Sequence, residues 1–402
     1  MPTDDSAFET TYLAERAIQA VNTGTIAYCK FLSANDTGDT GGHQSGIYIA
    51  KNALTILFDR PQMRGDNSER FVNIRWQDDF DTESRFIYYG AGTRNEYRIT
   101  RFQKGFPFLS TEHTGDLFVF VKRDEEHYQA YILSTEDEID SFLGHYGMSP
   151  SDTGTLISAG VPGDEDQLEA GIREFIASLT VEFPDTKDMA FAAQDIEARV
   201  FGHADDPRAD PDQKLLAWIG TEYTLFKRLE QDRYGDLISK GFSSVEEFVV
   251  LANSVLNKRK SRAGKSLEHH LAHIFDLNDL RYSAQPRTEG NKHPDFIFPN
   301  EAAYHTHGYP LEKLVVLAAK TSCKDRWRQV INEADLFKGR DTMKHLFTLQ
   351  QGISVSQLKE MEEEGVVLVV PKPYISTYPA SMRDRIWTLK RFIDYVKKTT
   401  SL

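Results

Sequence analysis

The sequence predicts an α/β protein in two parts, a β-rich first part followed by an α/β second part. Residues 27–133 contain several short alternating segments separated by turn residues, as in a barrel or sandwich. From residue 212 onward, apolar residues recur at helical spacing, and two short apolar strands follow at 296–298 and 314–320. With 402 residues, 40% of them hydrophobic, the chain is long enough for two domains.

The composition excludes several classes of protein. The net charge of −14 argues against a surface that is basic throughout, although a local basic patch could still bind nucleic acid. Two cysteines, Cys29 and Cys323, are too few for a disulfide framework or a cysteine zinc site, and they favour a reducing compartment. We find no signal peptide and no apolar run of membrane length, so we expect a soluble cytoplasmic protein.

The first part carries two polar loops between predicted strands. Residues 33–44 are rich in glycine, threonine and asparagine, and residues 90–101 hold three arginines together with an asparagine and a glutamate. Such side chains can read base edges in the major groove. Taken alone, loop 90–101 is better explained as a solvated hairpin, but two such loops in one β domain favour a DNA clamp. Strands are predicted at 27–32, 46–49, 71–76, 85–89, 117–122 and 127–133.

A connecting segment separates the two parts. Residues 149–166 are rich in glycine, serine, proline and acidic residues, as linkers are. We therefore predict a first domain over residues 1–175, which includes the linker from about 150, and a second domain over 176–402.

Helices open the second part, with a basic run between them. Helices are predicted at 214–234, from a capping box of Ser243 and Glu246 to Leu256, and at 267–275. Five of the eight residues 258–265 are basic. Such a run is often only a solvated face, but here it precedes a helix, and helix N-termini attract phosphate. We therefore expect Arg262 and Lys265 to contact DNA.

The two strands of the second part end on residues suited to phosphodiester hydrolysis. Asp295 opens strand 296–298, and Lys320 closes strand 314–320. Metal-dependent nucleases hold a divalent cation with carboxylates and place a lysine near the attacking water. The acid expected two residues before the lysine is missing, because position 318 is alanine, but Glu333 on the following helix can supply it. We predict Asp295, Lys320 and Glu333 as catalytic, with Asp295 and Glu333 binding the metal.

Two other sets of residues allow more than one interpretation. Glu268 is either a further acid of the site or an exposed helix acid that follows a Ser266 cap. His269, His270 and His273 have helical spacing that could suit zinc. They lack a carboxylate partner and a third ligand, so surface histidines are the favoured interpretation.

Rare motifs run through both parts. They are SANDTG and TGGHQ within 33–44, TRNE and RIT within 93–100, LANSV and RKSRAGKSLE within 251–268, TEGNK at 288–292, CKDRWRQ at 323–329 and NEAD at 332–335. On these motifs the chain resembles the EcoRII family of type IIE restriction endonucleases over nearly its whole length.

The resemblance implies an N-terminal DNA-binding pseudobarrel, the effector domain, and a C-terminal α/β/α nuclease of the PD-(D/E)XK type that dimerises. It implies Mg²⁺, cleavage at a CCWGG-like site, a second copy of the site that relieves autoinhibition, and a cognate cytosine methyltransferase. Gly92 and Tyr97 stand where the family is basic, which leaves the central base open. The implied base readers are Lys324, Asp325 and Arg326 in the nuclease, and Lys30, His43, Gln44, Arg94, Glu96 and Arg98 in the effector domain.

Two other classes of function compete with this interpretation. One is a DNA-binding regulator whose nuclease half is inactive, and the presence of Asp295, Lys320 and Glu333 argues against it. The other is a modification-dependent nuclease, in which the effector domain reads methylated cytosine.

Overall fold

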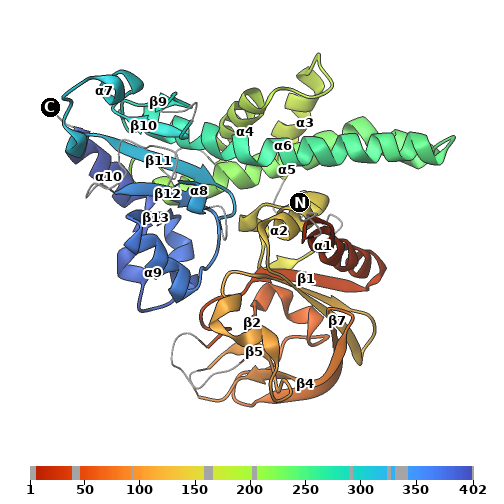
Figure 1. The fold of residues 1–402 in the computed structure, drawn as a ribbon. Coiled ribbons are helices and arrows are strands. Elements are labelled where there is room, and N and C mark those ends of the chain that lie inside the picture. Colours follow the sequence, from red (N-terminus) through yellow and green to blue (C-terminus); the bar gives the residue numbers. More distant parts are fainter. Residues whose placement is uncertain are drawn as a thin grey trace, which may run out of the picture.

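A computed structural model describes residues 6–38, 46–92, 94–157, 166–201, 206–288, 293–323, 327–330 and 343–400. It divides into a β-rich lower part and an α/β upper part joined near the N-terminal helix (Figure 1). This arrangement agrees with the fold class predicted from the sequence.

The first part is one curled sheet in the order β2-β5-β4-β3-β7-β6-β1-β8. Its pairs are antiparallel except for β3 with β7. The edges β2 and β8 are not paired with each other; instead the short helix η1 (Lys51–Ile56) packs against β1, β5 and β8. The barrel is therefore closed by a helical turn, as in a pseudobarrel. The strands are β1 (Ile26–Phe31), β2 (Ile47–Ile49), β3 (Ser68–Trp76), β4 (Phe80–Tyr89), β5 (Glu96–Thr100), β6 (Leu117–Lys122), β7 (His127–Leu133) and β8 (Thr155–Leu156).

Each face of this sheet has its own apolar core. The inner face is aromatic, with Trp76 stacked on Phe118 and Phe120 stacked on Tyr128. The outer face packs against α1 (Ser6–Thr23) and α2 (Glu136–Tyr146). A capping box of Thr135 and Glu138 starts α2, and Gly147, with φ of 56°, ends it. The start and end of α2 are thus encoded locally.

The next four helices are α3 (Asp166–Ser178), α4 (Thr186–Phe201), α5 (Pro211–Lys240) and α6 (Val245–Leu277). Ile172 and Ile176 of α3 share a core with Ile196 of α4 and Leu225 and Leu229 of α5. Packing thus groups α3 with the second part. The predicted boundary after residue 175 falls within α3.

One helix, α6, replaces the two that the sequence predicted. It continues through the basic run, because a single glycine such as Gly264 is tolerated inside a helix at a cost of about 1 kcal/mol relative to alanine. The predicted helix start at 267 is therefore wrong, and the phosphate argument based on it fails. The N-cap is Ser244, one residue after the predicted Ser243, which instead donates to the Glu247 carboxylate.

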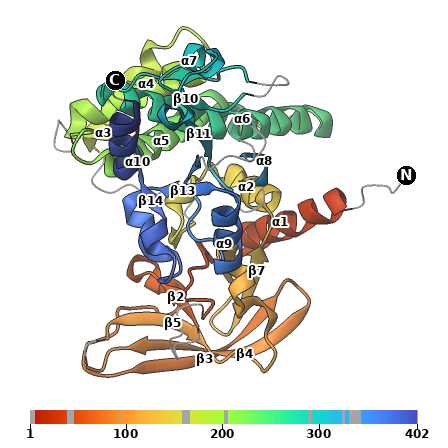
Figure 2. The ribbon, with the colours of Figure 1, turned by 60° about the vertical axis from the view of Figure 1, so that its left-hand side comes forward.

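The second sheet has the order β14-β13-β12-β11-β10-β9. Strands β11 to β14 are parallel, β10 runs antiparallel to β11, and β9 runs antiparallel to β10. The sheet lies between helices, with β13 between α10 (Leu389–Thr400) and α9 (Val355–Glu363) in both views (Figures 1 and 2). The strands are β9 (Ser283–Ala284), β10 (Phe296–Phe298), β11 (Val315–Lys320), β12 (Lys344–Thr348), β13 (Val366–Val370) and β14 (Trp387–Thr388), with short helices α7 (Glu301–His305) and α8 (Trp327–Val330).

Candidate active site

Pairing of β10 with β11 brings the predicted aspartate and lysine together. Phe296 lies opposite Leu317, so Asp295 lies level with the end of β11. Its Oδ2 accepts the Ala319 N–H at 2.7 Å and lies 3.3 Å from Lys320 Nζ. Asp295 is buried and Lys320 is partly exposed. One carboxylate oxygen is therefore held by the strand, while the lysine reaches solvent beside it.

A second carboxylate lies next to this pair. Glu268 of α6 and Asp295 are bridged by Gln285, whose Nε2 donates to Glu268 Oε2 at 2.8 Å and to Asp295 Oδ1 at 2.9 Å. Burial raises the pKa of Glu268, and the nearby charge of Asp295 raises that pKa further. Of the two interpretations of Glu268 that the sequence allowed, the geometry favours an acid of the site.

Glu333, Lys324, Asp325 and Arg326 lie outside the described residues. Within the described part of the chain, no three His, Cys, Asp or Glu side chains converge as a metal site would require. Ala318 is fully buried against the helices, so the usual position of the second acid is part of the core. The described acids of the site are therefore Asp295 and Glu268.

The basic run of α6 is mostly engaged within the protein. Arg259 pairs with Glu230 at 2.7 Å, and Lys258 Nζ lies over the Phe183 ring. Arg262 is buried, pairs with Glu222 at 2.9 Å and stacks on Tyr223. Lys265, in contrast, is exposed beside a cavity of about 550 Å³ that Arg262 also lines. In this arrangement the Lys265 ammonium is accessible to a ligand, whereas the Arg262 guanidinium is held by Glu222.

The histidine prediction is wrong for His270, which is completely buried. Its Nδ1 accepts from the Gln194 amide at 2.9 Å, and its Nε2 lies 2.8 Å from Glu222 Oε2. Burial raises the pKa of Glu222, but His270, Arg262 and Ser266 outweigh this effect and hold the pKa below its usual value. The periodicity did not reveal this cluster because its partners come from α4 and α5.

The described parts of the two polar loops, 33–44 and 90–101, come together around Tyr48. Lys30 Nζ contacts Asp36 Oδ2 at 2.6 Å and donates to the Tyr48 carbonyl, and Tyr48 pairs with Arg98 across β2 and β5. Glu96 Oε1 lies 3.4 Å from Arg98 Nε. Arg98 is buried, whereas Arg94 is exposed over the Tyr89 ring. His43 and Gln44 lie outside the described residues.

The first domain covers the ends of β11 and β12. Ser322, two residues beyond Lys320, donates to Asp140 Oδ1 of α2 at 2.9 Å. Gln350, two residues beyond β12, donates to the Gly115 carbonyl at 2.7 Å. Arg259 also donates to the last carbonyls of α2, those of Gly144 and His145. The carboxyl edge of the parallel strands, where α/β enzymes commonly bind ligands, is thus occupied by another part of the same chain.

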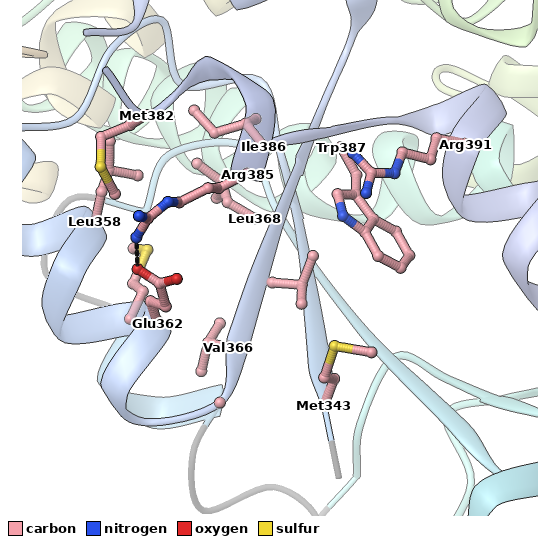
Figure 3. A pocket seen from close by; sticks show the side chains of 13 residues that line it. Met343, Leu358, Glu362, Val366, Leu368, Met382, Arg385, Ile386, Trp387 and Arg391 are labelled. Atoms are coloured by element: carbon pink, nitrogen blue, oxygen red, sulfur yellow. Dashed lines mark hydrogen bonds and ion pairs between the residues drawn. The ribbon is translucent and has the colours of Figure 1, made fainter. Parts of the chain in front are cut away.

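A separate cavity of about 340 Å³ lies at the β13–β14 edge of the sheet (Figure 3). Arg385 points at Glu362 and forms an ion pair with it, while Arg391 lies over the Trp387 ring. Among the predicted site residues that the structure describes, none lines this cavity. Elsewhere, the helices of the described ranges include none with the length and apolarity to cross a membrane.

A carboxylate and a lysine at adjoining strand ends, under helices that cover both faces of the sheet, define a nuclease class of α/β protein. Two family models match the chain, "EcoRII C terminal" over residues 226–393 and "Restriction endonuclease EcoRII, N-terminal" over residues 21–153. The type II restriction enzyme EcoRII of Escherichia coli is 41% identical over 386 residues, which cover 92% of this chain and 93% of that protein. The chain belongs to the EcoRII family of type II restriction enzymes, and it is a site-specific DNA endonuclease.

Two solved restriction enzymes resemble it more distantly. Metal-depleted Ecl18kI in complex with uncleaved, modified DNA is 16% identical, with a TM-score of 0.44, over 58% of this chain and 83% of that one. The PspGI–substrate DNA complex is 17% identical, with a TM-score of 0.45, over 54% of this chain and 93% of that one.

Proposed function

We propose that this enzyme is a magnesium-dependent type IIE endonuclease that cuts both DNA strands 5′ of a CC-x-GG, CCWGG-like site. The observation that carries the proposal is the 3.3 Å contact between Lys320 and Asp295, with Glu268 held to the same aspartate by one amide. Two carboxylates and a lysine this close together can bind a cation and transfer a proton at the same site.

The chemistry of the donor set fits a hard divalent cation, because all the candidate ligands are carboxylate oxygens. Asp295 and Glu333 would hold the metal, with Glu268 as a further acid beside them. Bound there, the metal would polarise the scissile phosphate and lower the pKa of a water molecule. Lys320 would position that water or take its proton. The strand holds Asp295 Oδ2 through the Ala319 N–H, and Oδ1 accepts from the Gln285 amide.

DNA would be read by two groups of residues. Lys324, Asp325 and Arg326 follow β11 directly and would contact base edges, while exposed Lys265 would contact a phosphate. Arg262 could join them only after leaving Glu222. In the effector domain, Lys30, His43, Gln44, Arg94, Glu96 and Arg98 would bind a second copy of the site.

Binding of that second copy would relieve an autoinhibited arrangement. The contacts of Asp140 with Ser322 and of Gly115 with Gln350 lie at the strand ends where DNA would have to approach Lys320. A duplex cannot enter while they persist, because its diameter far exceeds a hydrogen-bond distance. Effector DNA would favour the state in which the two domains have separated.

We also propose a cytoplasmic homodimer, since cutting both strands of a symmetric site calls for two equivalent active sites. A cognate cytosine methyltransferase would protect the host sites. Cleavage of methylated and unmethylated CC-x-GG duplexes, with the middle position varied, tests the specificity and separates this enzyme from a modification-dependent nuclease.

The catalytic assignment is tested with Lys320→Ala, and with Lys359→Ala, an exposed lysine of α9, as the matched control. We expect Lys320→Ala to abolish cleavage of plasmid DNA in Mg²⁺ while retaining DNA binding in a gel-shift assay. The control should cut as the parent does. Undiminished cutting by Lys320→Ala would refute the assignment, and absence of cutting by the parent would refute the proposed function.

A further inference from the structure

Gln285 occupies an unusual place in the candidate active site. It follows β9 directly, and its side chain lies on the solvent side of Glu268 and Asp295. Both of its acceptors are carboxylate oxygens, which at neutral pH only accept hydrogen bonds, so the amide must present its NH₂ group to both. The partially positive end of a neutral side chain thus lies between two carboxylates.

The backbone holds Gln285 firmly in this position. Its φ is 48°, in the left-handed region that residues other than glycine seldom adopt. Its N–H donates to the Asp295 carbonyl at 2.9 Å, and its carbonyl faces His293 Nδ1 at 3.4 Å. A strained backbone that is fixed on both sides beside a functional aspartate suggests a role at that site.

The side chain, in contrast, is free to leave. Gln285 is exposed, so its amide can exchange its carboxylate partners for water without a burial cost. Its two hydrogen bonds offset the repulsion between Glu268 and Asp295, and a cation bound to both carboxylates would offset the same repulsion more strongly.

We propose that Gln285 is a positioning residue that holds Glu268 and Asp295 together while no cation is bound, and that its amide is displaced when the cation binds. This inference rests on the proposed function, since it concerns the metal site of that reaction. The residue therefore preorganises the carboxylates and at the same time competes with the cation for them.

The test uses the full-length protein and Mn²⁺ alone, without DNA, at pH 8. Gln285→Ala removes the competing amide and keeps a Cβ, so the backbone strain is unchanged. We expect its Mn²⁺ dissociation constant to fall about three- to tenfold, as expected for two lost hydrogen bonds to charged groups, partly screened by water. We expect its metal-free melting temperature to fall as well.

Gln285→Lys should have the opposite effects, because a fixed positive charge replaces the amide. Its metal-free melting temperature should be the highest of the series, and its Mn²⁺ binding and cleavage should be lost. Gln231→Ala, an exposed glutamine of α5, is the control and should match the parent in all three measurements.

Calorimetric Mn²⁺ titration, melting curves with and without Mn²⁺, and plasmid cleavage together decide the matter. Weaker Mn²⁺ binding by Gln285→Ala would mean that the amide assists cation binding and does not compete with it, and parent-like behaviour of both variants would mean that it has no role; either result overturns the inference. A parent that neither binds Mn²⁺ nor cuts DNA would instead overturn the proposed function.

Discussion

Ser322 Oγ donates a hydrogen bond of 2.9 Å to Asp140 Oδ1, and so joins the effector domain to the chain two residues beyond Lys320. Ser322 is buried and follows the end of β11 directly. Under the proposed function, this contact blocks the approach of a DNA duplex to Lys320.

Replacing Asp140 with alanine should therefore weaken the closed arrangement. We expect faster cleavage of DNA with a single recognition site, by roughly two- to tenfold, because a hydrogen bond to a charged group contributes about 1 kcal/mol or more. Initial rates with and without a second DNA duplex measure the effect. Glu83→Ala, at an exposed acid of β4, serves as the control, and equal activation by both variants would contradict the prediction.

Gly115 offers a stronger test of the same arrangement. Its φ is 89°, and a Cβ added there would lie 2.1 Å from the Gly352 carbonyl oxygen in the nuclease domain. Gly115→Ala should force the two domains apart and raise single-site cleavage by roughly tenfold or more, as a loss of about 1.4 kcal/mol would. Cleavage should then no longer depend on effector DNA.

Gly105→Ala is a matched control for that variant. Gly105 has φ of 79° and no atom within 4 Å of an added Cβ, so it shares the backbone strain and lacks the clash. If both variants were activated equally, strain within the effector domain would be the cause, and the docking explanation would fail.

Glu222 neutralises a buried cationic cluster in the nuclease domain. Arg262 and Ser266 both donate to its carboxylate, at 2.9 and 2.7 Å, and Glu222 is completely buried. Glu222→Ala should lower the free energy of unfolding by about 3–5 kcal/mol, because Arg262 would remain buried without its partner. Glu169→Ala removes an ion pair with Arg228 that is more exposed than the Glu222 pair. It should lower the free energy of unfolding by about 1 kcal/mol or less. Thermal unfolding of both variants checks this, and equal losses would contradict the prediction.

His345 should make the nuclease domain sensitive to acid. It lies in the core among Trp387, Phe392 and Tyr395, and burial lowers its pKa to about 4. A histidine in the unfolded chain has a pKa of about 6.5. Above that pH His345 is neutral in both the folded and the unfolded state, so keeping it uncharged in the core costs the fold nothing. Stability is lost as the pH falls from about 6.5 to 4, and the loss amounts to about 3 kcal/mol.

Urea unfolding at pH 7.5 and 4.5 measures that loss. His345→Gln removes the titrating group, so its stability should fall less than that of the parent between the two pH values. His127→Gln, at an exposed histidine, should behave as the parent does. An unchanged pH dependence in His345→Gln would exclude His345 as the cause.

Short-range patterns determined much of this protein. Alternation located six strands of the first part, helical periodicity located α5, and Asp295 and Lys320 stood out because each lies at the end of an apolar strand. Strands β5 and β8 were missed, because they lie within the predicted polar loop 90–101 and the predicted linker. These features depend on neighbours along the chain, so they are legible in one sequence. Family motifs in both parts then indicated the EcoRII family, to which the comparisons also assign the chain.

The tertiary structure alone decided what lies opposite each side chain. Glu268 lies beside Asp295 because α6 packs on β11, and His270 is buried because α4 and α5 supply Gln194 and Glu222. The docking of α2 beside Ser322 depends on residues 182 positions apart. A helix repeat predicts which residues share a face, but the partner of that face is set by packing between distant elements, which no local pattern records.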